Sequence, residues 1–294
     1  MRIKNFMNKP EYFFNFRWII SNRSKRNAIA NDHFVLPWNL KISVFNDQIG
    51  KSIKKLGVHE LTVSEVLYRI IEPENVFIDI GANIGYMTSI ALIKMNGKGK
   101  IYCFEPHPVI FKKLEENIFN WKSNTIVELF NIGLSDKKES TTLNETENFS
   151  ENMGTASINT STVFTNNANA IECQIDILDN LIEAKTIKES IIIKIDIEGH
   201  ELNAFNGMKN LLTSKKVKHI IFEDHNKYPS DVSALLENYH FKIFGIEKKF
   251  GGPRLTNPKI TKYLPWESAN YVATLDENFL IQKVNDKGWG IFKY

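Results

Sequence analysis

The chain has 294 residues, of which 43% are hydrophobic and 24% charged, and these proportions exclude a wholly disordered or fibrous protein. A chain of this length forms one large domain, or one domain with a cap, whose core needs no disulfides. The net charge is +3, but residues 1–30 carry seven Lys or Arg against one Glu, so the rest of the chain has a net negative charge. This distribution excludes a basic core that binds nucleic acid.

Residues 1–72 are predicted to form a basic and aromatic arm followed by a cap. Aromatic and Ile side chains between Tyr12 and Ile20 share one helical face. Such a face either packs on its own domain, which is the commoner case, or rests on an anionic membrane surface. The sequence has no apolar stretch long enough to span a membrane and no signal-peptide pattern. We therefore expect a cytoplasmic protein, with peripheral contact at the inner face of the membrane through residues 1–30 as the alternative.

Within the cap, residues 34–45 are strand-like and residues 62–71 are predicted to form a helix. The rest of the chain, residues 73–294, alternates short apolar runs with helical patterns. Strands are predicted at 76–80, 100–104, 126–132, 191–195 and 217–222, helices at 84–95, 109–121, 202–212 and 232–238, and edge strands at 241–246 and 271–275. Apolar strands separated by helices imply a mostly parallel sheet covered on both faces. The predicted fold class is α/β, doubly wound.

An insertion rich in Ser, Thr and Asn interrupts this alternation at about residues 139–170. A connection this long inside a compact domain is typical of a binding loop, a lid or a small hairpin.

The first chemically informative string is Asp79-Ile-Gly-Ala-Asn-Ile-Gly85, which follows a predicted strand and opens a helix. Open α/β sheets bind ligands at such places, beyond the carboxyl ends of their strands. Gly81 allows a sharp turn, and Gly85 is expected to allow close approach of the backbone to a ligand. The dinucleotide pattern needs glycines where Asn83 and Tyr86 stand. The loop is therefore not expected to bind a pyrophosphate, and it is better suited to a smaller nucleoside ligand.

A second acidic residue strengthens this interpretation. Glu105 ends the next predicted strand, about one βαβ unit after Asp79, and precedes Pro106. A carboxylate in this position accepts hydrogen bonds from both hydroxyls of a ribose in dinucleotide-binding folds.

The string Lys194-Ile-Asp-Ile-Glu-Gly-His-Glu201 ends another strand of the same sheet, and Glu223 ends the next one. Asp196, Glu198 and Glu223 are expected at the same crevice, where they either form an ion-pair network with Lys194 or take part in chemistry. Oxygen ligands of this kind also suit Mg²⁺, but their spacing matches no dedicated metal motif, so we predict no required metal.

These motifs resemble class I S-adenosylmethionine-dependent methyltransferases, and the string from Lys194 to Glu201 resembles the FkbM-type family. The resemblance runs from about Leu36 to His240 and implies a Rossmann-like, mostly parallel, seven-stranded sheet with an N-terminal cap. It also implies the cofactor S-adenosylmethionine. The residues then expected to bind the cofactor are Glu60, Asp79, Gly81, Asn83, Gly85, Glu105, Ser135 and Asp196.

The implied activity is O-methylation of a glycan or another small hydroxylated metabolite. A hydroxyl is a weak nucleophile near neutral pH, so a base should remove its proton. The candidate bases are Asp196, Glu198, His200 and Glu223, and the sequence leaves the choice among them open. The alternative is a non-catalytic, nucleoside-binding or scaffold protein of a glycan assembly complex.

Overall fold

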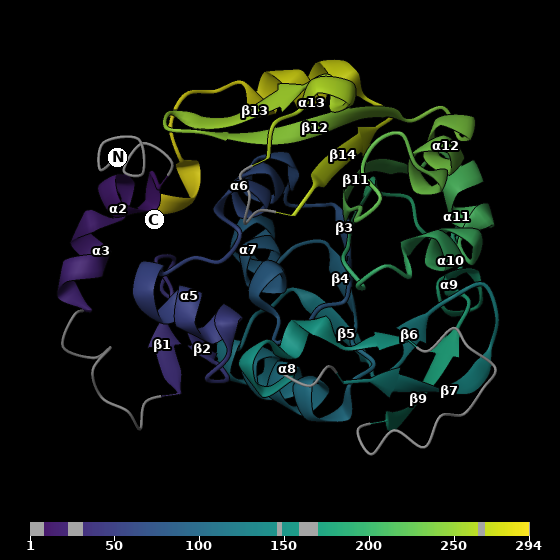
Figure 1. Cartoon of the computed structure of the whole chain (residues 1–294), viewed down its shortest axis with the longest axis horizontal. Coiled ribbons are helices and arrows are strands. Elements are labelled where there is room, and N and C mark those ends of the chain that lie inside the picture. Colours follow the sequence, from purple (N-terminus) through teal and green to yellow (C-terminus); the bar gives the residue numbers. More distant parts are fainter. Residues whose placement is uncertain (1–8, 23–31, 146–148, 159–169, 264–267, 294) are drawn as a thin grey trace.

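The computed structural model describes residues 9–22, 32–145, 149–158, 170–263 and 268–293 (Figure 1). Its centre is an eight-stranded sheet in the order β13-β12-β14-β11-β10-β3-β4-β5. The strands are β3 (Val76–Ile80), β4 (Lys100–Phe104), β5 (Ile126–Phe130), β10 (Ile191–Ile195), β11 (Val217–Glu223), β12 (Lys242–Lys249), β13 (Gly252–Thr256) and β14 (Asn270–Thr274). From β11 to β5 all neighbours pair in parallel, so the mostly parallel sheet expected from the sequence is confirmed.

The far end of the sheet differs from the expectation in two ways. β14 lies between β11 and β12, and β12 lies between β14 and β13, so both strands that were expected at an edge of the sheet are internal. β13 pairs with β12 as a hairpin and brings the sheet from the expected seven strands to eight. The segment Gly252–Thr256 contains Gly, Pro and Arg, which an edge strand tolerates. Because these residues form no apolar run, the sequence did not predict this strand.

Helices cover both faces of the sheet. Four of them pack on one face: α6 (Leu61–Ile70), α7 (Tyr86–Met95), α8 (Pro108–Trp121) and α13 (Glu277–Val284). The other face holds α9 (Leu178–Leu181), α10 (Glu201–Asn206), α11 (Lys209–Thr213) and α12 (Asp231–Asn238). The doubly wound arrangement is therefore confirmed. The helix predicted over 202–212 is broken at Gly207, where a Cβ would lie 1.9 Å from the carbonyl oxygen of Ser135.

The cap packs into the same core as the sheet. It contains β1 (His33–Val35), β2 (Lys41–Ser43) and α5 (Gln48–Leu56). Phe34, Leu36 and Trp38 belong to one buried cluster with Phe77 of β3. Residues on both sides of the expected boundary at 72 and 73 thus share one hydrophobic core.

The arm forms two short helices, α2 (Glu11–Phe14) and α3 (Phe16–Ser21), beside α5 and the cap strands (Figure 1). Asn15 Nδ2 donates to the carbonyl oxygen of Leu56 at 2.6 Å, and Trp18 Nε1 donates to that of Val35 at 3.0 Å. The aromatic face is not buried as a whole, because Phe13, Phe16 and Ile20 keep 57%, 57% and 54% of their surface exposed. Residues 1–8 and 23–31, which carry most of the basic charge, lie outside the described residues.

The insertion contributes a second, four-stranded sheet in the order β6-β9-β7-β8. Its strands are β6 (Gly133–Leu134), β7 (Glu139–Asn144), β8 (Ser157–Ile158) and β9 (Ala170–Asp176). β7 and β9 pair antiparallel, as expected for a small hairpin, while residues 146–148 and 159–169 lie outside the described part. Short 3₁₀ helices complete the fold at Phe149–Glu151, Met153–Thr155, Pro258–Ile260 and Gly290–Phe292. Within the described ranges, no helix is both long and apolar enough to cross a membrane.

Candidate functional site

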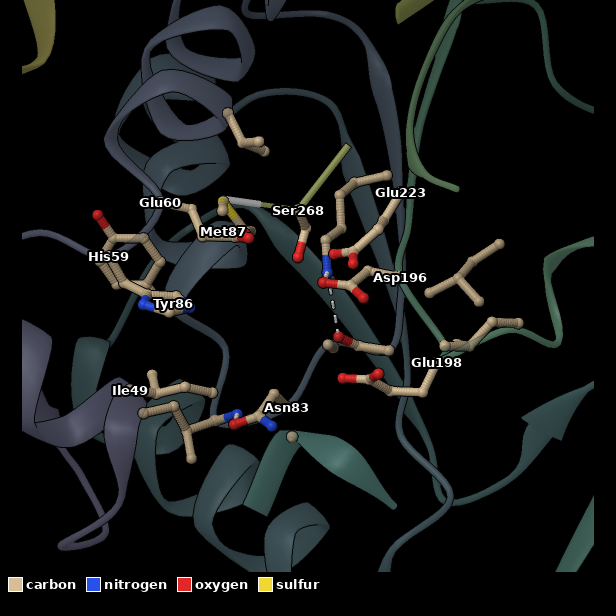
Figure 2. A pocket seen from close by; sticks show the side chains of 18 of the residues that line it. Ile49, His59, Glu60, Asn83, Tyr86, Met87, Asp196, Glu198, Glu223 and Ser268 are labelled. Atoms are coloured by element: carbon tan, nitrogen blue, oxygen red, sulfur yellow. Dashed lines mark hydrogen bonds and ion pairs between the residues drawn. The ribbon is translucent and has the colours of Figure 1, made fainter. Parts of the chain in front are cut away.

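A cavity of about 600 Å³ lies beyond the carboxyl ends of β3, β4, β10 and β11, with α5 and the start of α6 opposite (Figures 1 and 2). The loops that follow these four strands supply its polar walls. The sequence-predicted residues that line it are Glu60, Gly81, Asn83, Glu105, Asp196, Glu198 and Glu223. The structure therefore brings together most of the side chains that the motifs singled out.

The loop after β3 needs its first glycine for a steric reason. Gly81 has φ +75°, and a Cβ there would lie 2.0 Å from the carbonyl oxygen of Asp196. Gly85 has a different role from the expected one, because it does not line the cavity. A Cβ at Gly85 would meet Leu114 Cδ1 at 2.8 Å, so this glycine permits close packing of α8 on the start of α7.

Glu105 is fixed at the cavity wall by two backbone groups. Its Oε2 accepts from the N–H of Asn83 and its Oε1 from the N–H of His107, both at 2.9 Å. The residue is 6% exposed, and burial raises the pKa of its carboxyl to about 7. Each carboxylate oxygen has two lone pairs, so the side chain is held in place and still able to accept from a ligand hydroxyl.

Lys194 lines the cavity beside Asp196. Its Nζ is 3.4 Å from Asp196 Oδ2 and donates to the carbonyl oxygen of Gly81 at 3.4 Å. Burial by itself would lower the pKa of Lys194, but the charges of Asp196, Asp79 and Glu60 outweigh it and hold that pKa above its usual value. This lysine therefore stays charged and neutralises part of the acidic wall.

Asp79 was expected to contact the cofactor, but it is fully buried and is not among the cavity-lining residues. Its Oδ2 accepts from Thr88 Oγ1 at 2.6 Å, and its Oδ1 has no hydrogen-bond partner among the described residues. Burial raises the pKa of Asp79, while Lys194 opposes that rise. Asp79 therefore lies behind the cavity wall, opposite Lys194 in the register of β3 and β10.

Three carboxylates converge on the cavity from different elements. Glu60, Asp196 and Glu223 each place an oxygen within 4.8 Å of the others, and Figure 2 shows Asp196 and Glu223 together on one wall. Burial, followed by the charge of Asp196, raises the pKa of Glu223 to about 8. Such a cluster attracts a cation, either an organic one or a hard metal ion with oxygen ligands. The prediction that no metal is required therefore stays a prediction.

A second pair of side chains extends this acidic wall. Glu198 Oε2 is 3.4 Å from His225 Nε2, and His225 Nδ1 is 3.5 Å from Glu223 Oε1. The backbone of Glu198 has φ +54°. Burial raises the pKa of Glu198, and the charge of Asp196 adds to the rise. His225 thus connects the tips of β10 and β11.

His200 and Ser135 were expected at the site, but neither is among the described residues that line the cavity. His200 Nε2 lies 2.9 Å from Ser135 Oγ, and both side chains are buried. The turn explains this placement: Glu198 and Gly199 have φ +54° and +94°, and they direct the chain away from the cavity before α10 begins. We therefore do not retain His200 as a candidate base.

Sequence reasoning missed several lining residues. His59 precedes α6, and its ring centroid lies 6.0 Å from that of Tyr86; desolvation lowers the pKa of His59 to about 4. Glu11, Lys248 and Ser268 also line the cavity, although they come from distant parts of the chain. His59 directly precedes Glu60, which was expected at the site, whereas the others carry no local signal.

Comparison with known proteins gives consistent matches. A family model described as the methyltransferase FkbM domain matches residues 79–243. The hexuronic acid methyltransferase AglP of Haloferax volcanii is 29% identical over 184 residues, covering 60% of this chain and 67% of that protein. The AMB antimetabolite synthetase AmbE of Pseudomonas aeruginosa is 25% identical over 201 residues, covering 57% of this chain and 9% of that protein.

Among solved structures, the precorrin-6y C5,15-methyltransferase of Geobacter metallireducens aligns with 79% of this chain and 94% of its own, with 13% identity and a TM-score of 0.42.

Proposed function

The chain belongs to the FkbM methyltransferase family, and from this membership and the geometry of the cavity we propose that it transfers a methyl group from S-adenosylmethionine to a hydroxyl of a glycan or another small hydroxylated molecule. The observation that carries the proposal is one cavity lined both by a rigidly held Glu105 and by a cluster of three carboxylates. The name of the relative AglP supports a carbohydrate acceptor.

The donor groups of the cavity fit this cofactor. Glu105 is held by backbone N–H groups and retains lone pairs for the two hydroxyls of a ribose. Glu60 and Asp196 by themselves carry more negative charge than Lys194 neutralises, which suits the ammonium and sulfonium groups. When bound, the cofactor supplies a methyl group on a positively charged sulfur atom.

We assign the removal of the acceptor proton to Glu223. Its carboxyl is 7% exposed and lies in the acidic cluster, so as a carboxylate it is a stronger base than a solvated glutamate. Asp196 and Lys194 form the adjacent wall of the cavity. Holding the acceptor oxygen in line with the methyl group supplies much of the remaining rate enhancement.

The test of cofactor binding is Glu105→Gln. Losing hydrogen bonds to a charged group should weaken S-adenosylmethionine binding by about 1.5–3 kcal/mol. Because the pKa of Glu105 is raised to about 7, wild-type affinity should also increase as the pH rises through 7 and the carboxyl ionises.

Isothermal titration calorimetry measures both effects. The matched control is Glu128→Gln, which changes a carboxylate on β5 that pairs with Lys100 outside the cavity. Equal affinities of wild type and Glu105→Gln would refute the ribose assignment. Cofactor binding without methyl transfer to any hydroxylated acceptor would favour the alternative, a non-catalytic nucleoside-binding or scaffold protein.

We also propose that the arm contacts an anionic membrane surface. Phe13, Phe16 and Ile20 are large, exposed apolar side chains of α2 and α3, and the first 30 residues are strongly basic. Anionic lipids attract each nearby Lys or Arg by about 1 kcal/mol, and apolar side chains add to the attachment. The exposure of these three side chains favours this role over burial against the domain.

Flotation with liposomes tests the membrane proposal. Full-length protein should float with vesicles that contain phosphatidylserine but not with pure phosphatidylcholine, and added salt should weaken the attachment. Replacing both Phe16 and Ile20, the exposed side chains of α3, by serine should abolish flotation. The control is Phe119→Ser, because Phe119 on α8 is 81% exposed and lies outside the arm. Equal flotation of both variants, or none by the wild type, would contradict the proposal.

A further inference from the structure

The cavity is also lined by a pair of side chains from the arm and from the far end of the sheet. Glu11 of α2 and Lys248 of β12 are separated by 237 residues in sequence, and Lys248 Nζ lies 3.4 Å from Glu11 Oε1. Gln48 and Ser52 of α5 line the same region. These elements are distinct from the loops after β3, β4 and β10 to which cofactor binding is assigned.

The second carboxylate oxygen of Glu11 is incompletely satisfied. Glu11 is 5% exposed, and its Oε2 is buried with no hydrogen-bond partner among the described residues. Buried polar atoms are nearly always hydrogen-bonded in folded proteins, because an unpaired one loses its interactions with water and gains none in return. The ion pair with Lys248 uses only the other oxygen. A carboxylate oxygen in this state needs a donor.

Attachment of the arm does not by itself explain this buried acid. The arm is also held by Asn15 Nδ2, which donates to the carbonyl oxygen of Leu56, and by contacts of Phe13 and Phe14 with the Phe250 ring at centroid distances of 5.5 Å. The side chains of Asn15, Phe13, Phe14 and Phe250 are not among the described residues that line the cavity. Glu11 and Lys248 both line the cavity, and a charged pair in a cavity wall suits recognition of a polar ligand.

We propose that Glu11, held in place by Lys248, is a specificity-determining residue that accepts a hydrogen bond from a hydroxyl of the methyl acceptor. This hydroxyl is distinct from the one that is methylated, so the acceptor carries several hydroxyls, as a sugar does. The inference rests on the proposed function, because it takes the neighbouring loops as the cofactor site. A carboxylate accepts and does not donate, so it selects a hydroxyl over an ether or a carbonyl oxygen at that position.

The test measures sugar binding with the cofactor site filled. Full-length protein saturated with S-adenosylhomocysteine is examined by saturation-transfer NMR with D-glucose, D-mannose and D-glucuronic acid as probes. Wild-type protein should bind at least one of the three. Glu11→Gln should weaken that binding roughly tenfold, as expected for loss of a hydrogen bond to a charged group. Its calorimetric affinity for S-adenosylhomocysteine should stay within twofold of wild type.

Two control variants separate recognition from attachment of the arm. Glu72→Gln breaks another Glu–Lys ion pair, with Lys283, outside the cavity and should leave sugar binding unchanged. Asn15→Ala loosens the arm but leaves the Glu11 carboxylate intact, so its effect should be smaller than that of Glu11→Gln.

Each remaining outcome counts against the inference. Equal losses in Asn15→Ala and Glu11→Gln would assign Glu11 to arm attachment alone. Unchanged sugar binding in Glu11→Gln would mean that water satisfies Oε2. Binding of S-adenosylhomocysteine without any sugar would overturn this inference but not the proposed cofactor site. Failure of S-adenosylhomocysteine to bind would overturn both.

Discussion

Replacing Glu223 by glutamine is expected to lower the rate of methyl transfer by about 10²- to 10⁴-fold, the usual contribution of a positioned general base. Glutamine keeps the shape of the side chain but cannot accept the proton of the acceptor hydroxyl. Transfer of tritium from labelled S-adenosylmethionine to a panel of sugars and sugar acids measures the rate. Because Asp196 and Glu60 remain, cofactor affinity should fall much less than the rate.

The pH dependence gives a second readout of the same prediction. Burial raises the pKa of Glu223 to about 8, so the rate should increase with pH as this carboxyl ionises. The positive charge of a bound cofactor favours the ionised form of Glu223, so this rising limb of the pH–rate profile should lie below pH 8. The limb should vanish in Glu223→Gln and persist in His200→Ala, whose imidazole pairs with Ser135 outside the cavity. A limb that survives in Glu223→Gln would assign the base to another group.

Replacing Lys194 by methionine is expected to destabilise the protein by about 3–5 kcal/mol, because it leaves buried carboxylates without their counter-charge. Lys194 is 6% exposed, and Asp79 is fully buried beside it with an oxygen that has no hydrogen-bond donor among the described residues. Urea denaturation at neutral pH measures the loss.

The double variant with Asp79→Asn separates this charge effect from a loss of packing. Removing the Asp79 charge should recover part of the stability lost in Lys194→Met, giving a coupling energy well above that of an exposed pair. The control is Lys100→Met on β4, whose pair with Glu128 is partly exposed and should contribute less than about 1 kcal/mol. A loss no larger than that of the control, without coupling, would contradict the role given to Lys194.

The wall of the cavity that we propose to bind the cofactor could be predicted from the sequence, because its position depends on local rules. Apolar runs ending at Gly81 and Glu105 mark two parallel strands, and the carboxyl ends of parallel strands meet at one edge of a sheet. The same reasoning correctly brought Asp196 and Glu223 to that edge. It did not distinguish residues that face the cavity from those beneath it, such as Asp79.

The remaining errors arise where backbone turns or distant contacts decide the outcome. His200 follows a turn with two successive positive φ angles, which no apolar periodicity reveals. Glu11 reaches the cavity only because α2 packs near β12, a contact between the two ends of the chain. β13 lacks an apolar run because it is an edge strand.

Calorimetric titration of the full-length chain with S-adenosylmethionine tests most directly whether the cavity beyond β3, β4 and β10 binds this cofactor. Our prediction is one binding site per chain, displacement by S-adenosylhomocysteine, and affinity that falls in Glu105→Gln but not in Glu128→Gln. No binding at millimolar cofactor, or binding that is indifferent to Glu105, would contradict it.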